Sequence, residues 1–173
     1  MHLEVGSLPF HLCSVQIFFL FATKFMKDEN KKAILESFMS LTMLIGGILA
    51  ILIPTCGVKF TRVQVYQYFL FHFFIIYYAL NLMFVKKVDM GVKAYARNVC
   101  LLLLMVVLGL WINSILSFAD TNFLYLTRPP MSGLPILNLD NGWYAYFFSL
   151  LFIGILLVSL LHLPFIIKEK KNK

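Results

Sequence analysis

Apolar residues come in five long runs that are separated by shorter polar stretches. The runs lie near residues 8–26, 34–54, 65–85, 98–118 and 143–167. At a rise of about 1.5 Å per residue, a helix of such a length crosses a hydrocarbon layer of about 30 Å. None of the runs shows the strict alternation of an outer-membrane strand. The pattern predicts an all-α, polytopic membrane bundle of about five transmembrane helices, with residues 1–173 forming a single integral membrane domain.

Composition supports the same class of protein. The chain is 61% hydrophobic and only 13% charged, whereas soluble domains are about 45–50% apolar and about 25% charged. A soluble fold of this size could not bury so much apolar surface, because small domains keep a large fraction of their surface exposed. A disordered chain and a secreted disulfide scaffold are excluded for the same reason.

The positive charges are confined to one side of the predicted bundle. Twelve of the 15 cations fall in the first connection, the third connection and the tail: Lys24, Lys27, Lys31, Lys32, Lys86, Lys87, Lys93, Arg97, Lys168, Lys170, Lys171 and Lys173. Cytoplasmic loops carry such an excess, so we expect the N-terminus outside and the C-terminus in the cytoplasm. The net charge of +7 then indicates contact with anionic lipid head groups, and we expect membrane lipids as partners and no nucleic acid.

The first residues, MHLEVGS, carry neither a positive n-region nor a cleavage site of a secretory signal. A first helix that begins outside usually follows another helix, so we expect relatives to carry one or more upstream helices that this chain lacks. Reverse insertion, driven by the lysines between residues 24 and 32, is the open alternative.

Polar side chains within the runs are the candidate functional residues, because they are costly in hydrocarbon. Gln64, Tyr68 and His72 recur at i, i+4 and i+8, which predicts that they line one stripe of a helix. Gln67 lies about 140° from His72 around the same helix, so it is expected outside this stripe. The functional interpretation is an outward-opening polar pocket with His72 at its floor and His11 beside it. Hydrogen bonding between helices is the alternative.

Two ionisable residues lie at the predicted inner side. Glu36 follows Lys32 by one turn, so we expect the two to pair at the interface. His162 precedes Pro164 near the end of the last run, where we expect an interfacial residue.

The longest connection, residues 119–142, keeps apolar residues throughout. Pro129 and Pro130 exclude regular helix there, and the DNG sequence that ends at Gly142 predicts a turn before the last helix. We expect this loop to lie back against the bundle, either as a re-entrant lid over the pocket or as a surface loop stapled by aromatic residues. Trp143, Tyr144 and Tyr146 would follow as an aromatic belt.

The three cysteines, Cys13, Cys56 and Cys100, show no C-x-x-C spacing, so neither a disulfide framework nor a zinc site is predicted. His11 and Cys13 would lie about 200° apart on a helix, which disfavours a direct pair. Motifs of nucleotide, phosphate and metal binding are missing, and we expect no cofactor and no metal. The Gly46-Gly47 pair predicts close helix packing.

Several segments together resemble one family. LPFHLCSVQIF, GGILAILIP, QYFLFHFFI, NFLYLTRPP and the later NGWY are similar to the YwaF-like family of bacterial integral membrane proteins, over most of the chain. The resemblance implies a multi-pass protein of the bacterial cytoplasmic membrane.

That family is distantly similar to a eukaryotic transmembrane acyltransferase that acts on ether phospholipids. The N-P-C-H sequence around the nucleophile of that branch matches Leu8, Pro9, Phe10 and His11 here. The histidine is kept, but Phe10 stands where a thioester mechanism needs cysteine. Cys13 lies one turn later, where it can face the same cavity. The resemblance implies a shared bundle and not the reaction itself.

Three functions follow as hypotheses. In the first, the protein handles or modifies lipids, with His11 and His72 as general base or charge stabiliser. Residues predicted to bind the substrate, including an anionic head group, are Gln64, Tyr68, Asn113, Asn122, Tyr125 and Arg128. The alternatives are a small-solute transporter or transporter component, disfavoured by the lack of internal repeats, and a structural subunit. Whether the chain is an enzyme, and in which oligomeric state, stays open.

Overall fold

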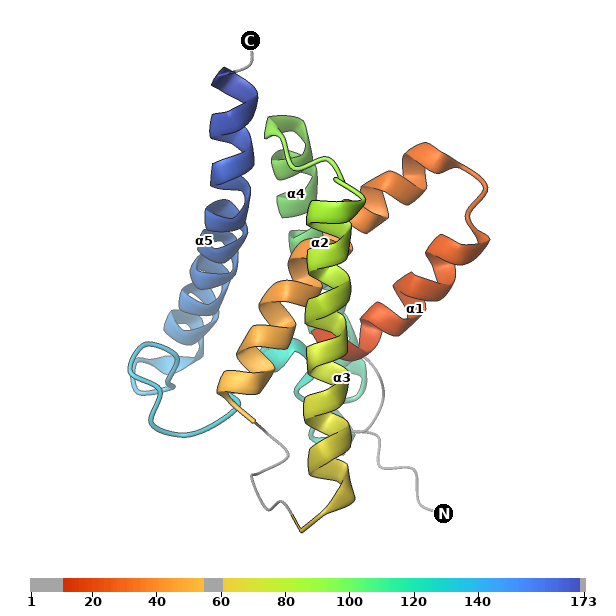
Figure 1. Ribbon diagram of the computed structural model, residues 1–173. Helices are drawn as coiled ribbons and strands as arrows, with labels where there is room; N and C mark the ends of the chain where they lie inside the picture. Colours follow the sequence, from red (N-terminus) through yellow and green to blue (C-terminus); the bar gives the residue numbers. More distant parts are fainter. Residues whose placement is uncertain (1–10, 55–60, 172–173) are drawn as a thin grey trace.

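The computed structural model describes residues 11–54 and 61–171, and within these ranges the regular structure is entirely helical. Five α-helices run in alternating directions along the bundle (Figure 1). They are α1 (Leu12–Phe25), α2 (Glu29–Leu52), α3 (Val63–Leu80), α4 (Val92–Ile115) and α5 (Gly142–Lys171). A π-helical segment, η2 (Asn81–Val85), extends α3. The predicted all-α fold is confirmed.

Four of the five predicted spans have helices long and apolar enough to cross a membrane: α2, α3 with its η2 extension, α4 and α5. The first helix is shorter. With 14 residues, α1 is about 21 Å long, less than the thickness of a hydrocarbon layer. Residues 8–10 of the first predicted span lie outside the described residues.

Helix α2 is the centre of the bundle and contacts each of the other four α-helices. In its most apolar stretch 61% of the residues are buried, against 11% in α5. Two adjacent glycines allow other helices to pack closely against α2, as the Gly46-Gly47 pair predicted. A Cβ atom at Gly47 would lie 2.6 Å from Ile76 of α3, and one at Gly46 would lie 3.1 Å from the Cys13 sulfur of α1. The other long helices turn apolar faces outward, as proteins surrounded by lipid do.

The lysine-rich segments lie together at one end of the bundle. The α1–α2 connection, the α3–α4 connection and the end of α5 all lie at that end (Figure 1). At this end Asp28 caps α2, because its carboxylate accepts hydrogen bonds from the backbone N–H groups of Asn30 and Lys31. The grouping of the cations on one side is therefore a property of the fold, whereas the side of the membrane on which they lie stays a prediction.

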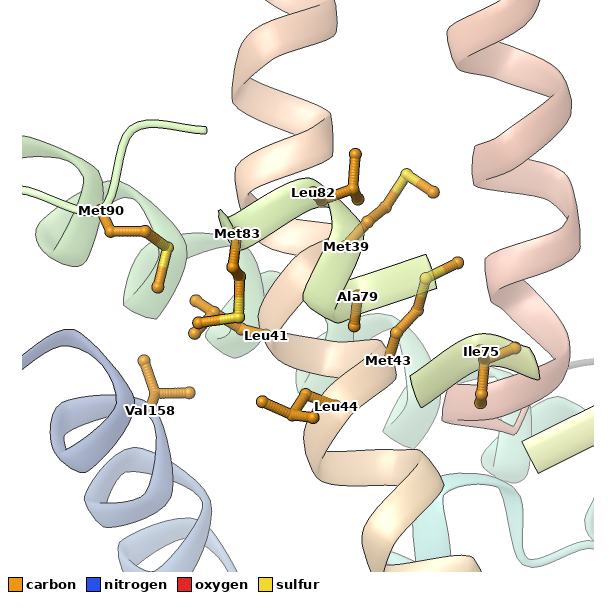
Figure 2. Close-up of a cluster of buried hydrophobic side chains, with 10 residues drawn as sticks. All are labelled: Met39, Leu41, Met43, Leu44, Ile75, Ala79, Leu82, Met83, Met90 and Val158. Atoms are coloured by element: carbon orange, nitrogen blue, oxygen red, sulfur yellow. The ribbon is translucent and has the colours of Figure 1, made fainter. Parts of the chain in front are cut away.

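The hydrophobic core fills the half of the bundle nearer this end. Figure 2 shows side chains of α2 packed against those of α3 and η2, with Met90 and Val158 closing the cluster. The core side chains are Met39, Leu41, Met43, Leu44, Ile75, Ala79, Leu82, Met83, Met90 and Val158. Methionine is common here because its unbranched side chain fills irregular gaps.

Two expectations for this end of the bundle are wrong. His162 is fully buried, because α5 turns it toward the α3–α4 connection, where its Nδ1 bonds the Met90 carbonyl at 2.8 Å. Glu36 is ion-paired with Lys86, since α2 turns it toward the end of η2. Lys32, its expected partner, pairs with Glu29. Tertiary contacts between distant segments thus decide both cases.

Candidate functional site

A cavity of about 690 Å³ lies in the half of the bundle away from the lysine-rich segments. All five α-helices and the loop after α4 contribute to its wall. Most of the wall is apolar. Its polar or titratable side chains are His11, Cys13, Ser14, Thr42, Gln64, Gln67, Tyr68, His72 and Tyr125. The volume lies within the range of about 300–1,000 Å³ that is typical of ligand pockets.

Helix α3 supplies a regular face to this cavity. Its lining residues are Gln64, Gln67, Tyr68, Phe71 and His72, the i, i+3, i+4, i+7, i+8 pattern of one helical face. The predicted stripe of Gln64, Tyr68 and His72 is therefore turned toward one space. Gln67, which was expected to lie outside the stripe, also lines the cavity, because the face is an arc whose two edges are Gln67 and His72.

One ring nitrogen of His72 is hydrogen-bonded within the described part of the chain and the other is not. Nδ1 lies 2.7 Å from the carbonyl oxygen of Tyr68, one turn earlier on the same helix. A carbonyl can only accept a hydrogen bond, so Nδ1 carries a proton, and Nε2 of a neutral ring has its lone pair available. In the described part of the chain no group bonds Nε2. The rings of Tyr68 and Phe71 pack against the imidazole, with centroids 4.2 and 5.2 Å away.

His11 reaches the same cavity from the start of α1. It is the N-cap residue of that helix, with extended backbone, and its ring contacts the rings of Phe123 and Tyr125 at centroid distances of 5.5 and 5.3 Å. Because His11 precedes the first helical turn, the angular argument that separated it from Cys13 does not apply. Both residues line the cavity.

The long loop forms one wall of the cavity. Residues between 126 and 141 form no helix, as the prolines predicted, and Gly142 adopts a left-handed φ of 86° at the predicted turn. The loop lies against the bundle, and its residues in the cavity wall are Leu124, Tyr125, Leu126, Pro130, Leu134 and Leu137.

Asn113 holds this loop and does not line the cavity. Its side-chain amide donates to the backbone carbonyl of Phe123 at 3.0 Å and accepts from the backbone N–H of the same residue at 2.8 Å. This pairing satisfies both backbone groups of a buried residue. Asn113 thus fixes the 3₁₀ segment η4 (Phe123–Tyr125) against α4.

Asn122 and Arg128 also stabilise the loop and lie outside the cavity wall. The Asn122 amide oxygen accepts hydrogen bonds from the Thr127 hydroxyl and from the backbone N–H groups of Thr127 and Arg128. The Arg128 guanidinium binds both carboxylate oxygens of Asp120 and its backbone carbonyl. The charge of Arg128 is therefore already paired within the loop.

Two aromatic residues of α5 hold the loop from the other side, so the aromatic stapling expected in the alternative of a surface loop is present. The Tyr146 hydroxyl donates to the carbonyl of Tyr125, and the Trp143 indole N–H donates to the carbonyl of Leu126 at 3.0 Å. The predicted aromatic belt is wrong for Tyr146, which is 1% exposed, whereas Tyr144 is exposed. Two residues apart on a helix, these side chains point in nearly opposite directions.

The segment η4, whose Tyr125 carbonyl accepts from Tyr146, has an uncommon backbone conformation. Leu124 and Tyr125 both adopt left-handed conformations, with φ values of 57° and 55°, which cost energy in residues other than glycine. Leu124 fits because α4 has Gly109 beside it; a Cβ there would lie 2.9 Å from the Leu124 side chain. The result is that Tyr125 lies in the cavity wall next to His11.

Comparison with known proteins decides the family. The model of the TMEM164 family matches residues 5–162. The chain belongs to the TMEM164 family. Neither a curated protein nor a solved structure matches it. Membership in a multi-pass membrane family agrees with the fold, whereas the bacterial YwaF-like branch and the likeness to an acyltransferase stay predictions.

The chemistry available to this TMEM164 family member is that of neutral donors and acceptors. Within the described ranges no three His, Cys, Asp or Glu side chains gather as metal ligands. The described wall of the cavity also contains no Asp, Glu, Lys or Arg. His72 and His11 are its strongest proton acceptors, and Cys13 is its one thiol. This arrangement can bind an apolar chain and act on a single polar group.

Proposed function

We propose that this chain is a lipid-handling membrane protein, in which the cavity takes a lipid chain and the two histidines meet its polar group. One observation carries the proposal: His11 and His72, which are far apart in the sequence, line the same mostly apolar cavity. Histidines that only join helices would instead bond across a helix interface. The hydrogen bond of His72 stays within its own helix, which leaves Nε2 for a ligand.

The proposed roles follow the positions of the side chains. His72 serves as the general base through Nε2, and His11 binds or stabilises charge beside it. Gln64, Tyr68 and Tyr125 lie in the wall and would contact the lipid. We assign an indirect role to Asn113, Asn122 and Arg128, because their polar groups hold the loop.

The mostly apolar wall favours a lipid over a small polar solute. A carrier for such a solute needs polar groups along its path, and burying a polar group without a partner costs free energy. We retain the predicted orientation, with the lysine-rich end in the cytoplasm, so the cavity would open toward the outer leaflet of the cytoplasmic membrane of a bacterial, YwaF-like protein.

Lipid mass spectrometry of cells with and without the protein tests this function. We expect the abundance of at least one lipid species to change with the protein and to revert in the His11→Ala/His72→Ala double variant. Tyr77→Ala is the matched control, since Tyr77 lies on α3 and is exposed outside the cavity.

A lipid profile that responds equally to the native protein and the double variant would refute the histidine roles. An unchanged profile in all cells would refute lipid modification and favour transport or a structural role. The amount of each variant in the membrane must be equal for these comparisons.

A further inference from the structure

We infer that the occupant of the cavity is a lipid with an uncharged hydroxyl head, in the class of long-chain alcohols and acylglycerols with a free hydroxyl, whose hydroxyl donates to Nε2 of His72. The inference rests on the proposed function and specifies its ligand. It follows from the direction of the hydrogen bonds and from the charges of the site.

The direction of hydrogen bonding requires a donor on the ligand. The Tyr68 carbonyl holds the proton of His72 on Nδ1, so a neutral ring offers only the lone pair of Nε2. A positively charged ring would lie among aromatic and aliphatic side chains, with no carboxylate in the described wall to balance it. A hydroxyl group provides the donor that the neutral ring lacks.

Two hydroxyl groups of the wall, those of Thr42 and Tyr68, are already engaged in the fold. The Thr42 hydroxyl donates to the Phe38 carbonyl at 3.0 Å and accepts from the Gln16 amide at 2.9 Å. The Tyr68 hydroxyl donates to the Ala50 carbonyl at 3.0 Å. Nε2 of His72, in contrast, has no hydrogen-bond partner among the described residues and stays available to a ligand.

The charges of the site disfavour an anionic head group. A phosphate or carboxylate in the cavity would meet no Lys or Arg side chain in the described wall. The nearby Arg128 binds both carboxylate oxygens of Asp120. Burying an unpaired anion costs far more than burying a hydroxyl that makes a hydrogen bond, so the head group is uncharged.

The cavity has room for a lipid chain. Its volume of about 690 Å³ lies within the range of about 300–1,000 Å³ that is typical of sites which bury most of a small ligand. Its mostly apolar wall suits the chain of a long-chain alcohol or an acylglycerol.

Photolabelling tests the inference on the full chain in phosphatidylcholine nanodiscs. The probe is hexadecan-1-ol with a diazirine in its chain, and peptide mass spectrometry identifies the labelled residues. We expect labels on the walls formed by α3 and α5, and unlabelled hexadecan-1-ol should compete at least tenfold better than its methyl ether, hexadecanoate or a diacyl phosphatidate. The ether keeps the chain and loses only the donated proton.

Two pairs of variants connect the label to the proposed contacts. His72→Leu removes the acceptor and should lower labelling at least tenfold, whereas His72→Gln keeps an acceptor and should restore part of it. Gly154→Leu should block the cavity, because a Cβ at Gly154 meets only Leu102 at 3.8 Å and the larger side chain has space to enter. Ala145→Leu, on the exposed face of α5, should label as the native protein does.

The results distinguish a failure of the inferred ligand from a failure of the proposed lipid-handling function. Equal competition by the alcohol and the ether, or stronger competition by hexadecanoate, would overturn the hydroxyl head and leave lipid handling in place. Labelling of the wall by a diacyl phosphatidylcholine probe but not by the alcohol would also overturn the hydroxyl head, because this phospholipid has no hydroxyl to donate. No labelling of the wall by either probe would overturn the proposed function itself. The competition experiments use the native chain, so they do not depend on the folding of any variant.

Discussion

His162 and His72 each bond a backbone carbonyl through Nδ1, but they differ in the hydrogen bonding of Nε2. Each ring holds Nδ1 against a backbone carbonyl, that of Met90 for His162 and that of Tyr68 for His72. Nε2 of His162 then accepts from the Asn98 amide at 3.3 Å, whereas no described group bonds Nε2 of His72. One histidine is fully used by the fold, and the other keeps an atom for a ligand.

The surroundings of the two residues explain this difference. At the lysine-rich end, Asn98 also donates to Ser37, whose hydroxyl donates to the Asp89 carbonyl, so polar groups from α2, α4, α5 and the α3–α4 connection form one network beside the hydrophobic core. At the other end the helices leave a cavity. A buried polar residue is therefore a candidate site only when the fold leaves one of its atoms without a partner.

The largest effect on stability is expected for His162→Ala. The change removes the donor to the Met90 carbonyl and one of the two acceptors of the Asn98 amide and opens a void, so we expect a loss of about 3 kcal/mol in the free energy of unfolding. His72→Ala should cost less than about 1 kcal/mol, because the ring borders an existing cavity. Unfolding of both variants in detergent would measure the difference, and equal losses would contradict the comparison.

A smaller effect is expected where α2 and α3 approach each other. A Cβ at Gly47 meets Ile76 at 2.6 Å and the His72 carbonyl at 3.3 Å, so Gly47→Ala should separate these helices and cost about 2 kcal/mol of stability. The matched control is Gly154→Ala, where there is space for a Cβ and helix propensity favours alanine by up to about 1 kcal/mol. Thermal unfolding would compare them; a Gly47→Ala protein as stable as the control would show that the close contact is easily relieved.

Tyr146→Phe tests how firmly α5 holds the cavity loop. It removes the hydrogen bond to the Tyr125 carbonyl and should cost about 1 kcal/mol. Faster amide hydrogen exchange at residues 122–128 should accompany the loss, since this bond secures a left-handed turn. Tyr144→Phe, at an exposed site, should leave exchange unchanged. Identical exchange in both variants would mean that Asn113 and Trp143 hold the turn without Tyr146.

The smallest effect is expected for Arg128→Ala. Its ion pair with Asp120 is exposed, with 45% and 84% of the two side chains accessible, so the loss in stability should be about 0.5 kcal/mol or less. Asp120→Ala should behave alike in unfolding experiments. Loss of lipid labelling in Arg128→Ala alone would assign the arginine to a head group, which would reverse the indirect role proposed for it.

The helices and the cavity-facing stripe of α3 could be predicted because they depend on local pattern. Gln64, Tyr68 and His72 share a face in any regular helix. The positions of His162, Glu36 and Tyr146 were predicted wrongly, since each depends on a partner that is distant in the sequence: Met90, Lys86 and Tyr125. The bonds of Asn113 to Phe123 across the α4–η4 turn also had no signal in the spacing.

The sequence by itself determined that this is a multi-pass membrane protein with helical spans, basic segments at one end and a non-helical loop at the other. Hydrocarbon imposes these features, because each spanning backbone must satisfy its own hydrogen bonds and each charge must stay near water. Only the tertiary structure decided which histidine keeps a ligand-binding atom. That property depends on whether packing from other helices supplies a partner to Nε2, as it does for His162 and does not for His72.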